Sequence, residues 1–268
     1  MEKIGIFAGV GDIVSLAIDG IKKAGKQPVI FSFYDLNFPQ IKFYKILIGD
    51  FEGFFNIINK ENISKMIFIG KIHPEEMFKK DIVPAGAQFL KSLSTLTPED
   101  VMLKLVDIFE KNNIKILPLS RFLKHNIAEE KIYSIEKPEP KQWVDIDFAW
   151  KMAKFIAQKK IGQAVSIKNG MVVAVEGIEG TDEMIKRTGR YCQDFTVAKV
   201  MRTGQSTKFD LPTIGPKTID VFLEYKGKVL VFEAGKTIIV DEEKIKDIAS
   251  KHNIIILGYK GKKDKYVD

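Results

Sequence analysis

The first half of the chain alternates short apolar segments with amphipathic helical ones, and this alternation restricts the fold more than any other feature. The segment IGIFA is a predicted strand, and residues 13–24 follow as a helix with apolar side chains on one face. The sequence then predicts strands at PVIFSF, YKILI, KMIFIG and IKILPL, with helices over residues 51–60 and 98–111. Strands that alternate with helices form a doubly wound parallel sheet, so we expect a Rossmann-like α/β amino-terminal domain.

The second half has a different pattern, in which hairpins are mixed with helices. An Asn-Gly pair lies between the alternating segments AVSIK and MVVAV, which is the strongest local signal for a β-hairpin. The segment KVLVFEAGKTIIVD again reads as strand, glycine turn and strand. Helices are predicted to begin after Gly180, at Gly215-Pro216 and at Asp241, and NIIILGY is a last buried strand. We therefore expect an α+β carboxy-terminal domain.

The segment IEKPEPKQWVDID separates these two patterns. It carries two prolines and alternating charges and shows no apolar periodicity, which is typical of a linker. A chain of 268 residues with 45% hydrophobic residues can bury a core in each of two domains. We expect a nucleotide- or substrate-binding domain over residues 1–136 and a catalytic domain over residues 137–268.

The chain has a net charge of +7 but carries no known docking motif for nucleic acid. Nearly all of the 42 basic residues are lysines, and they are interleaved with Asp and Glu along the chain, so we expect no nucleic-acid partner. No apolar run approaches the roughly 20 residues needed to span a bilayer, and the N-terminal residues lack a signal-peptide layout. We expect a cytoplasmic protein whose lysines allow transient contact with the anionic surface of the inner membrane.

Residues 172–219 concentrate acidic side chains beside glycine turns. Glu176 and Glu179 follow the apolar segment MVVAV, Asp182 opens a helix, and Asp210 precedes a Leu-Pro pair. A buried strand delivers the residues that follow it to the end of a sheet, where ligands usually bind. Hard divalent cations prefer oxygen ligands, so these four carboxylates are candidate ligands for Mg²⁺, with Mn²⁺ as a second candidate ion. Taken singly, each acid is also an ordinary helix cap or a solvated turn residue.

The first predicted strand ends in the turn GVGD, whose Gly9, Gly11 and Asp12 lead into the first helix. At the carboxyl end of a parallel strand, the N–H groups of the following helix point at a ligand, and a nucleotide phosphate suits such a position. The third glycine of a dinucleotide fingerprint is absent, with Val14 in its place, so an ordinary turn is the alternative. Lys71 follows KMIFIG in the same way and is either a phosphate ligand or a solvated lysine.

Phenylalanine is abundant, with 19 in the chain, and two segments are especially dense in it, FYDLNFPQIKFY and FEGFF. Core packing is the first interpretation of this density. Lining of a channel for an acyl chain, or contact with a membrane, is the alternative.

Three long segments of the second half, GQAVSIKNGMVVAVEGIEGTDEMIKRTG, DLPTIGPKT and FEAGKTIIVD, resemble the carboxy-terminal domain of the LpxI-type UDP-2,3-diacylglucosamine pyrophosphatases. The N-terminal segment IGIFAGVGDIVSLAIDGIKKAGKQPVIFSF is similar to the other domain of that family. The resemblance implies Mg²⁺-dependent hydrolysis of the pyrophosphate in UDP-2,3-diacylglucosamine. The products would be UMP and 2,3-diacylglucosamine 1-phosphate, also called lipid X, in a step of lipid A biosynthesis. It also implies a homodimer.

The resemblance further implies roles for individual residues. Asp210 would act at the reacting phosphorus, either by binding the metal or by orienting the attacking water. The residues implied to bind substrate come from both halves of the chain: Gly9, Gly11, Asp12, Lys71, Gln163, Thr181, Lys199, Thr213 and Gly215. The chain departs from the family pattern close to this chemistry, because Ser206 and Lys208 stand where the family usually has Asp and Arg.

Two other functions remain open at this point. Hydrolysis or transfer on another nucleotide-linked sugar would use the same phosphate-binding residues without an apolar crevice for acyl chains. A non-catalytic sensor of a nucleotide-linked lipid is the second alternative, and the residues at positions 206 and 208 favour it slightly.

Overall fold

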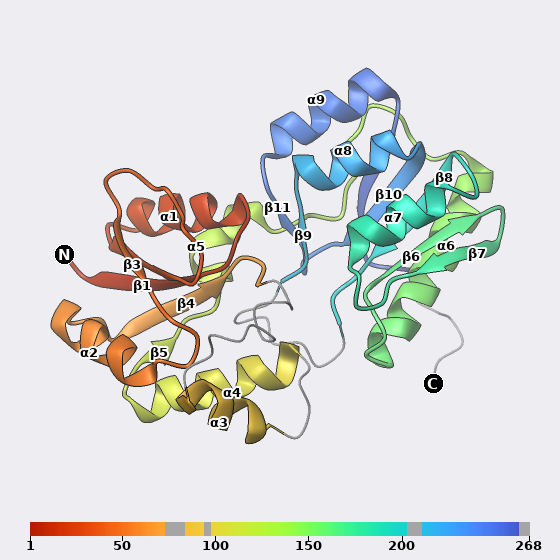
Figure 1. Ribbon diagram of the computed structural model, residues 1–268. Coiled ribbons are helices and arrows are strands. Elements are labelled where there is room, and N and C mark those ends of the chain that lie inside the picture. The colour runs from red at the N-terminus through yellow and green to blue at the C-terminus, as the bar shows by residue number, and fades with distance from the viewer. Residues whose placement is uncertain (73–83, 94–97, 203–210, 263–268) are drawn as a thin grey trace. The chain divides into compact units, whose positions relative to one another are not determined.

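The computed structural model describes residues 1–72, 84–93, 98–202 and 211–262 (Figure 1). The chain divides into two compact units, with the division between Lys124 and His125. No helix in the described part of the chain has the length and apolar character required to cross a bilayer.

The amino-terminal unit is built on a five-stranded sheet in which every neighbouring pair is parallel. The strand order is β3-β2-β1-β4-β5, so the chain winds outward from β1 in both directions, as a doubly wound sheet requires. This confirms the predicted α/β fold. The strands are β1 (Lys3–Ala8), β2 (Gln27–Ser32), β3 (Lys42–Lys45), β4 (Lys65–Ile69) and β5 (Lys115–Ile116).

Helices cover both faces of this sheet (Figure 1). One face carries α1 (Ile13–Lys23) and α5 (Ser120–Leu123), with the short 3₁₀ helix η2 (Lys124–Asn126) after them. The other face carries α2 (Phe51–Glu61), α3 (Pro84–Lys91) and α4 (Pro98–Lys111). Helix α3 was not predicted.

Strand β3 ends at Lys45, earlier than the predicted strand YKILI. The next residue, Ile46, is buried in the core, whereas Leu47 is exposed. The apolar run YKILI therefore extends past the end of the strand, because Ile46, which follows β3, packs in the core. In a short segment, buried residues and paired strand residues show the same apolar pattern.

The carboxy-terminal unit has a mixed five-stranded sheet with the order β12-β10-β8-β6-β7. The first three strands in this order are parallel, while β6 runs antiparallel to β8, and β6 and β7 form the predicted hairpin. These strands are β6 (Ala164–Lys168), β7 (Met171–Val175), β8 (Phe195–Lys199), β10 (Gly227–Glu233) and β12 (Ile255–Tyr259).

Two further strands, β9 (Thr213–Ile214) and β11 (Ile238–Ile239), pair with each other in a separate small parallel sheet. The segment KVLVFEAGKTIIVD is thus a strand, a turn and a strand, but its two strands belong to different sheets.

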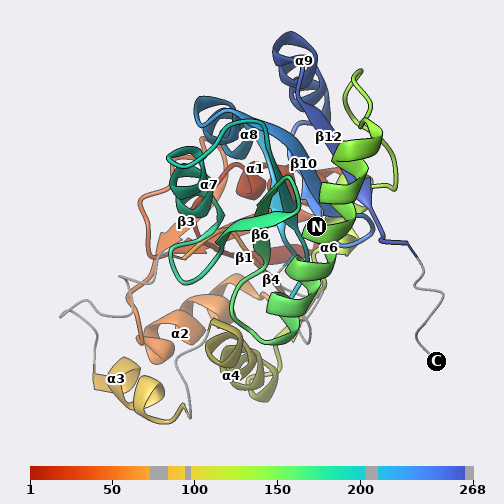
Figure 2. The same cartoon turned by 90° about the vertical axis from the view of Figure 1, so that its right-hand side faces the viewer.

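Helices also cover both faces of the carboxy-terminal sheet (Figure 2). One face packs against α7 (Thr181–Gly189), α8 (Pro216–Glu224) and α9 (Glu242–His252). The predicted starts of these helices are confirmed, since Gly180, Gly215 and Asp241 are their N-caps. The opposite face packs against the long helix α6 (Pro140–Gln158).

The segment expected to be a linker contains the start of α6. The Glu139 amide donates to the Gln142 side-chain oxygen over 2.9 Å, and Pro140 occupies the first turn, where its missing N–H costs no hydrogen bond. The prediction of a linker was wrong for residues 140–147, because the prolines and charged residues at the start of α6 are also typical of linkers. The apolar side of α6, including Ala149 and Ala153, is fully buried on the sheet.

The observed boundary between the units precedes the expected one at Lys137. Residues 125–136 belong to the second unit because their backbone pairs with it. The Tyr133 amide, for example, donates to the Ile256 carbonyl of β12 over 2.8 Å. Such pairing satisfies buried backbone groups and is not visible as a composition change.

Candidate functional site

The carboxyl edge of the carboxy-terminal sheet gathers polar residues from several strands. Lys199 ends β8 and lies opposite Phe232, next to Glu233 at the end of β10. The antiparallel strand β6 begins at this edge, since Ala164 pairs with Lys199, and β7 ends there, since the Glu176 amide donates to the Ala164 carbonyl over 2.9 Å. The sheet topology thus brings together residues that are far apart in sequence, at the edge where open α/β sheets bind ligands.

Glu176 is buried at this edge, with a relative exposure of 3%, and each of its carboxylate oxygens accepts a hydrogen bond. One oxygen accepts from the Gln163 amide over 3.1 Å, and the other accepts from the Thr181 hydroxyl over 3.1 Å. Gly162 makes room for this arrangement, because a Cβ there would lie 2.0 Å from the Glu176 carbonyl oxygen. Glu176 therefore links the start of β6 to the start of α7.

Glu179 and Asp182 lie on the turn and helix that follow. Glu179 accepts from Arg187 over 2.5 Å and from the Gly177 amide over 3.1 Å, and Arg187 also donates to the Val175 carbonyl over 2.8 Å. Asp182 is exposed in the first turn of α7, where a negative charge stabilises the helix. The carboxylate of Glu179 is neutralised by a neighbouring cation, which sequence reasoning did not predict.

These contacts bear on the predicted metal ligands. Within the described residues, no three Asp, Glu, His or Cys side chains gather in a way that could hold a metal ion. Glu176 and Glu179 accept hydrogen bonds from protein donors, and each of their oxygens keeps a second lone pair. Asp210, the fourth predicted ligand and the predicted catalytic residue, lies outside the described residues, as do Ser206 and Lys208.

Glu233 is a second buried carboxylate at the same edge. Its Oε1 accepts from Lys154 over 2.9 Å and lies 3.1 Å from the Lys236 ammonium, and its Oε2 accepts from the Met201 amide over 2.9 Å. Burial raises the pKa of this carboxyl, but the hydrogen bonds from Lys154 and the Met201 amide outweigh that effect and hold the pKa below its usual range. Glu233 is therefore an anion that orients two ammonium groups. Lys154 was not predicted as a site residue, because helix α6 was not predicted.

Lys199, Thr213 and Gln163 supply the remaining polar groups here. The Lys199 side chain is largely buried, with a relative exposure of 8%, and its ammonium makes a long hydrogen bond of 3.4 Å to the Thr213 carbonyl. The side-chain oxygen of Gln163 is buried without a protein hydrogen-bond partner among the described residues. Gly215, two residues after Thr213, begins α8. This edge can accept an anionic ligand at a buried cation and two helix starts.

In the amino-terminal unit, the turn after β1 is held against the end of β4. The Gly9 amide donates to the Ile69 carbonyl over 2.8 Å, and Val10 and Lys71 exchange two backbone hydrogen bonds of 2.9 Å. A Cβ on Gly9 would lie 2.4 Å from the Lys71 carbonyl oxygen, so only glycine fits there. Because its amide is taken, Gly9 shapes the turn and does not donate to a ligand through that group.

The rest of this turn remains accessible. Gly11 has a φ of +119°, a conformation that favours glycine. Asp12 is the N-cap of α1 and makes no side-chain capping hydrogen bond, and both Asp12 and Lys71 are exposed. The structure brings Gly9, Gly11, Asp12 and Lys71 to one edge of the sheet, as predicted.

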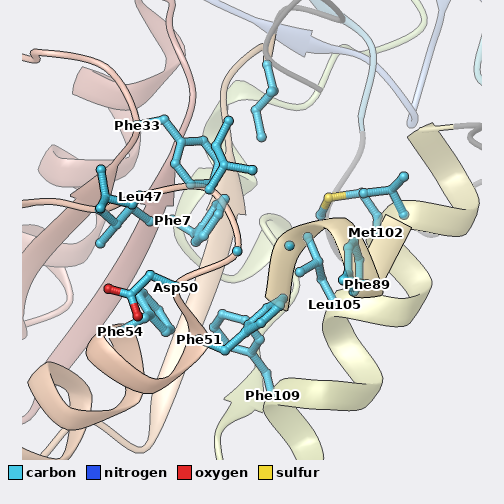
Figure 3. A pocket seen from close by; sticks show the side chains of 16 residues that line it. Phe7, Phe33, Leu47, Asp50, Phe51, Phe54, Phe89, Met102, Leu105 and Phe109 are labelled. Atoms are coloured by element: carbon cyan, nitrogen blue, oxygen red, sulfur yellow. The ribbon is translucent and has the colours of Figure 1, made fainter. Parts of the chain in front are cut away.

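An apolar pocket lies inside the amino-terminal unit beside this turn (Figure 3). Its walls come from β1, the segment after β3, and helices α2, α3 and α4. Six of the phenylalanines line it: Phe7, Phe33, Phe51, Phe54, Phe89 and Phe109.

Comparison with known proteins agrees with this division of the chain. Residues 3–126 match the family model described as LpxI N-terminal domain, and residues 129–257 match that described as LpxI C-terminal domain. The chain is 28% identical over 273 residues to UDP-2,3-diacylglucosamine pyrophosphatase LpxI of Caulobacter vibrioides, covering 96% of this chain and 98% of that protein.

Among solved structures, the chain is similar to a GalE-like L-threonine dehydrogenase from Cupriavidus necator in its holo form. The similarity covers 42% of this chain and 34% of the dehydrogenase chain, with 9% sequence identity and a TM-score of 0.29. An overlap this weak carries no argument about fold or activity. The two family models together cover nearly the whole chain, from β1 to β12. The chain belongs to the LpxI family of hydrolases.

Proposed function

We propose that this protein hydrolyses the pyrophosphate bond of UDP-2,3-diacylglucosamine. The observation that carries the proposal is a buried ammonium, Lys199, at a sheet edge shared with the starts of α7 and α8, in a chain whose two units both match the LpxI family. A buried cation and helix N-termini are suited to a phosphate group. The LpxI of Caulobacter vibrioides, which carries that substrate in its name, supports this choice of substrate.

The reaction requires one bond to break and one to form. Water attacks the phosphorus on the sugar side, its oxygen bonds to that phosphorus, and the bond to the bridging oxygen breaks. The bridging oxygen leaves with UMP, and the sugar keeps a 1-phosphate, so the second product is 2,3-diacylglucosamine 1-phosphate. Negative charge develops on the phosphoryl oxygens, and preorganised donors lower the barrier by stabilising that charge.

The described residues would contribute binding and orientation. Lys199 would neutralise a phosphate oxygen, while Thr181 at the start of α7 and Gly215 at the start of α8 would bring backbone amides to the same group. Glu233 would hold Lys154 and Lys236 at the edge in a fixed arrangement. In the amino-terminal unit, Gly11, Asp12 and Lys71 remain the proposed contacts to the uridine nucleotide.

Mg²⁺ is part of the proposal as a charge-neutralising ion on the pyrophosphate. Mg²⁺ often takes only one or two protein carboxylates and keeps water and substrate phosphate as its other ligands. Asp182, which is exposed, and Asp210 are the carboxylates we propose for it. We propose a supporting role for Glu176 and Glu179, because hydrogen bonds from the protein already fix both side chains and Arg187 balances the charge of Glu179.

The proposal is tested by measuring UMP release from UDP-2,3-diacylglucosamine with Mg²⁺ and with a chelator, for the protein and for Asp210→Ala. We expect release that depends on the metal and that falls by orders of magnitude in Asp210→Ala, while circular dichroism and substrate binding stay unchanged. Asp182→Ala, made in parallel, should raise the Mg²⁺ concentration needed for half-maximal rate. Undiminished release in the chelator would contradict the metal requirement, and tight binding without release would favour a sensor.

The cytoplasmic location, the transient contact with the inner-membrane surface and the homodimer remain predictions of the same proposal.

A further inference from the structure

The apolar pocket of the amino-terminal unit has rigid aromatic walls. The Phe7 ring makes edge-on contacts with the rings of Phe33, Phe54 and Phe109, at centroid separations of 5.3, 6.2 and 6.3 Å. Phe51 and Phe89 pair across α2 and α3 at 5.6 Å. Such ring pairs fix one another's orientation, so the pocket is formed without an occupant.

The lining of the pocket selects an occupant without polar groups. Among the described residues that line it, Asp50 alone is charged. Its carboxylate already accepts from the Gly53 amide over 2.9 Å, as the N-cap of α2. The remaining surface is aromatic and aliphatic side chains and glycine backbone, and a polar occupant would lose its hydrogen bonds with water there without replacement.

The pocket also lies next to the turn that we propose binds phosphate. Phe7 stands two residues before Gly9 in β1, and Ile72 directly follows Lys71, whose backbone pairs with Val10. Figure 3 shows Phe7 and Phe33 on one side of the space and Met102 and Leu105 of α4 on the other. A molecule with an apolar end in the pocket would therefore have its polar end close to an exposed lysine.

We propose that this pocket binds the terminal part of one acyl chain of the substrate and makes turnover depend on acyl-chain length. The proposal rests on the proposed function, which supplies a ligand that carries both phosphate and hydrocarbon. The pocket has a volume of about 160 Å³. A dry cavity of roughly 150 Å³ holds one benzene molecule, so the pocket has room for about six carbon atoms of a chain.

The test is the rate of UMP release, as kcat/KM, for substrates whose acyl chains are shortened stepwise. A buried methylene is worth about 0.8 kcal/mol, so kcat/KM should fall roughly fourfold for each carbon withdrawn from the pocket. Met102→Trp fills the pocket and should remove this dependence by lowering kcat/KM for long chains only. Phe33→Ala enlarges the pocket and should shift the preference toward longer chains.

Leu103→Trp is the matched control, because Leu103 is the next residue of α4, is exposed and does not line the pocket. It should keep the chain-length dependence of the unmodified protein. The same dependence in Met102→Trp as in the control would overturn the proposal, provided that both variants melt near the temperature of the unmodified protein. So would a rate that is independent of chain length in the unmodified protein.

Direct binding separates this proposal from the proposed function. A fluorescent long-chain fatty acid should bind the unmodified protein and the Leu103→Trp control, and bind at least tenfold more weakly to Met102→Trp. Probe binding without any UMP release would reject the proposed reaction and support the pocket as a hydrocarbon site. UMP release with equal probe binding by all three proteins would reject the pocket and support the reaction.

Discussion

Replacing Glu176 by glutamine tests whether this buried carboxylate supports the site or binds metal. In the structure its two oxygens each accept one hydrogen bond, from the Gln163 amide and from the Thr181 hydroxyl, both at 3.1 Å. Glutamine has the same shape but keeps only one oxygen, so its NH₂ group must face one of these donors. The glutamine oxygen can still accept from the Gln163 amide, and its NH₂ group can donate to the Thr181 hydroxyl, so what is lost is the negative charge of the acceptor in both hydrogen bonds.

The magnitude follows from the loss of this charge. A hydrogen bond to a charged group contributes about 1.5–3 kcal/mol and one between neutral groups about 0.5–1.5 kcal/mol, so weakening both bonds should lower the free energy of unfolding by about 2 kcal/mol. For a domain of roughly 150 residues, each kcal/mol shifts the melting temperature by about 2–4 °C, which predicts a decrease of roughly 4–8 °C. The Mg²⁺ concentration that gives half-maximal rate should stay unchanged, because we propose that the ion binds Asp182 and Asp210.

Thermal unfolding followed by circular dichroism, together with a Mg²⁺ titration of UMP release, measures both effects. Glu183→Gln is the matched control: it makes the same chemical change on an exposed residue of α7 that pairs with Lys186 over 2.8 Å, and such surface pairs contribute little. An unchanged melting temperature in Glu176→Gln would refute the supporting role. A large rise in the Mg²⁺ requirement would show instead that Glu176 is a metal ligand.

Three further predictions follow from other contacts. Gly9→Ala should lower the melting temperature measurably, because its Cβ would lie 2.4 Å from the Lys71 carbonyl oxygen. Gly25→Ala is the comparison: Gly25 has open space around it but a φ of +69°, so this variant measures backbone strain without a clash. Gly258→Ala would place a Cβ 2.1 Å from the Glu129 carbonyl oxygen, so limited proteolysis should cut residues 125–136 faster than in the unmodified protein.

Glu61→Gln should make the free energy of unfolding depend less on pH. Hydrogen bonds from Lys42, Tyr44 and Lys3 lower the pKa of Glu61 to about 2 from its usual 4.5. The ionised Glu61 therefore stabilises the fold above pH 4.5, and this contribution is lost as the pH falls toward 2. Urea unfolding of the unmodified protein and of Glu61→Gln should be measured at several pH values between 4.5 and 2. The difference between their free energies of unfolding should become smaller as the pH falls, and a difference that stays constant would contradict the prediction.

The fold was predictable wherever local pattern and tertiary structure agree. The alternation around β1, α1 and β2 and the hairpin of β6 and β7 are encoded by apolar periodicity and by one Asn-Gly turn, and both were predicted. Helix α6 was missed because its first turn is built from prolines and charged residues that also occur in linkers. The end of β3 was misplaced because burial of Ile46 outside the sheet resembles a strand.

The positions of the candidate site residues in the fold were easier to predict than their contacts. Glu176 and Lys199 share the carboxyl edge because of strand directions that the sequence pattern indicates only in part, and Thr213 of the small sheet reaches it through a hydrogen bond to Lys199. That Glu179 would be paired with Arg187 depends on how the turn after β7 folds onto α7, which no local signal describes. The sequence identifies the acidic side chains, but only the fold determines which protein donors their oxygens accept hydrogen bonds from.

The most direct test of the central claim is hydrolysis of UDP-2,3-diacylglucosamine by the purified protein in ¹⁸O-labelled water, with the products identified by mass spectrometry. The account predicts unlabelled UMP and a 2,3-diacylglucosamine 1-phosphate that carries one ¹⁸O atom, because water attacks the phosphorus on the sugar side. Label in UMP would contradict that direction of attack. Substrate that stays intact with folded protein and Mg²⁺ would contradict the proposed reaction itself.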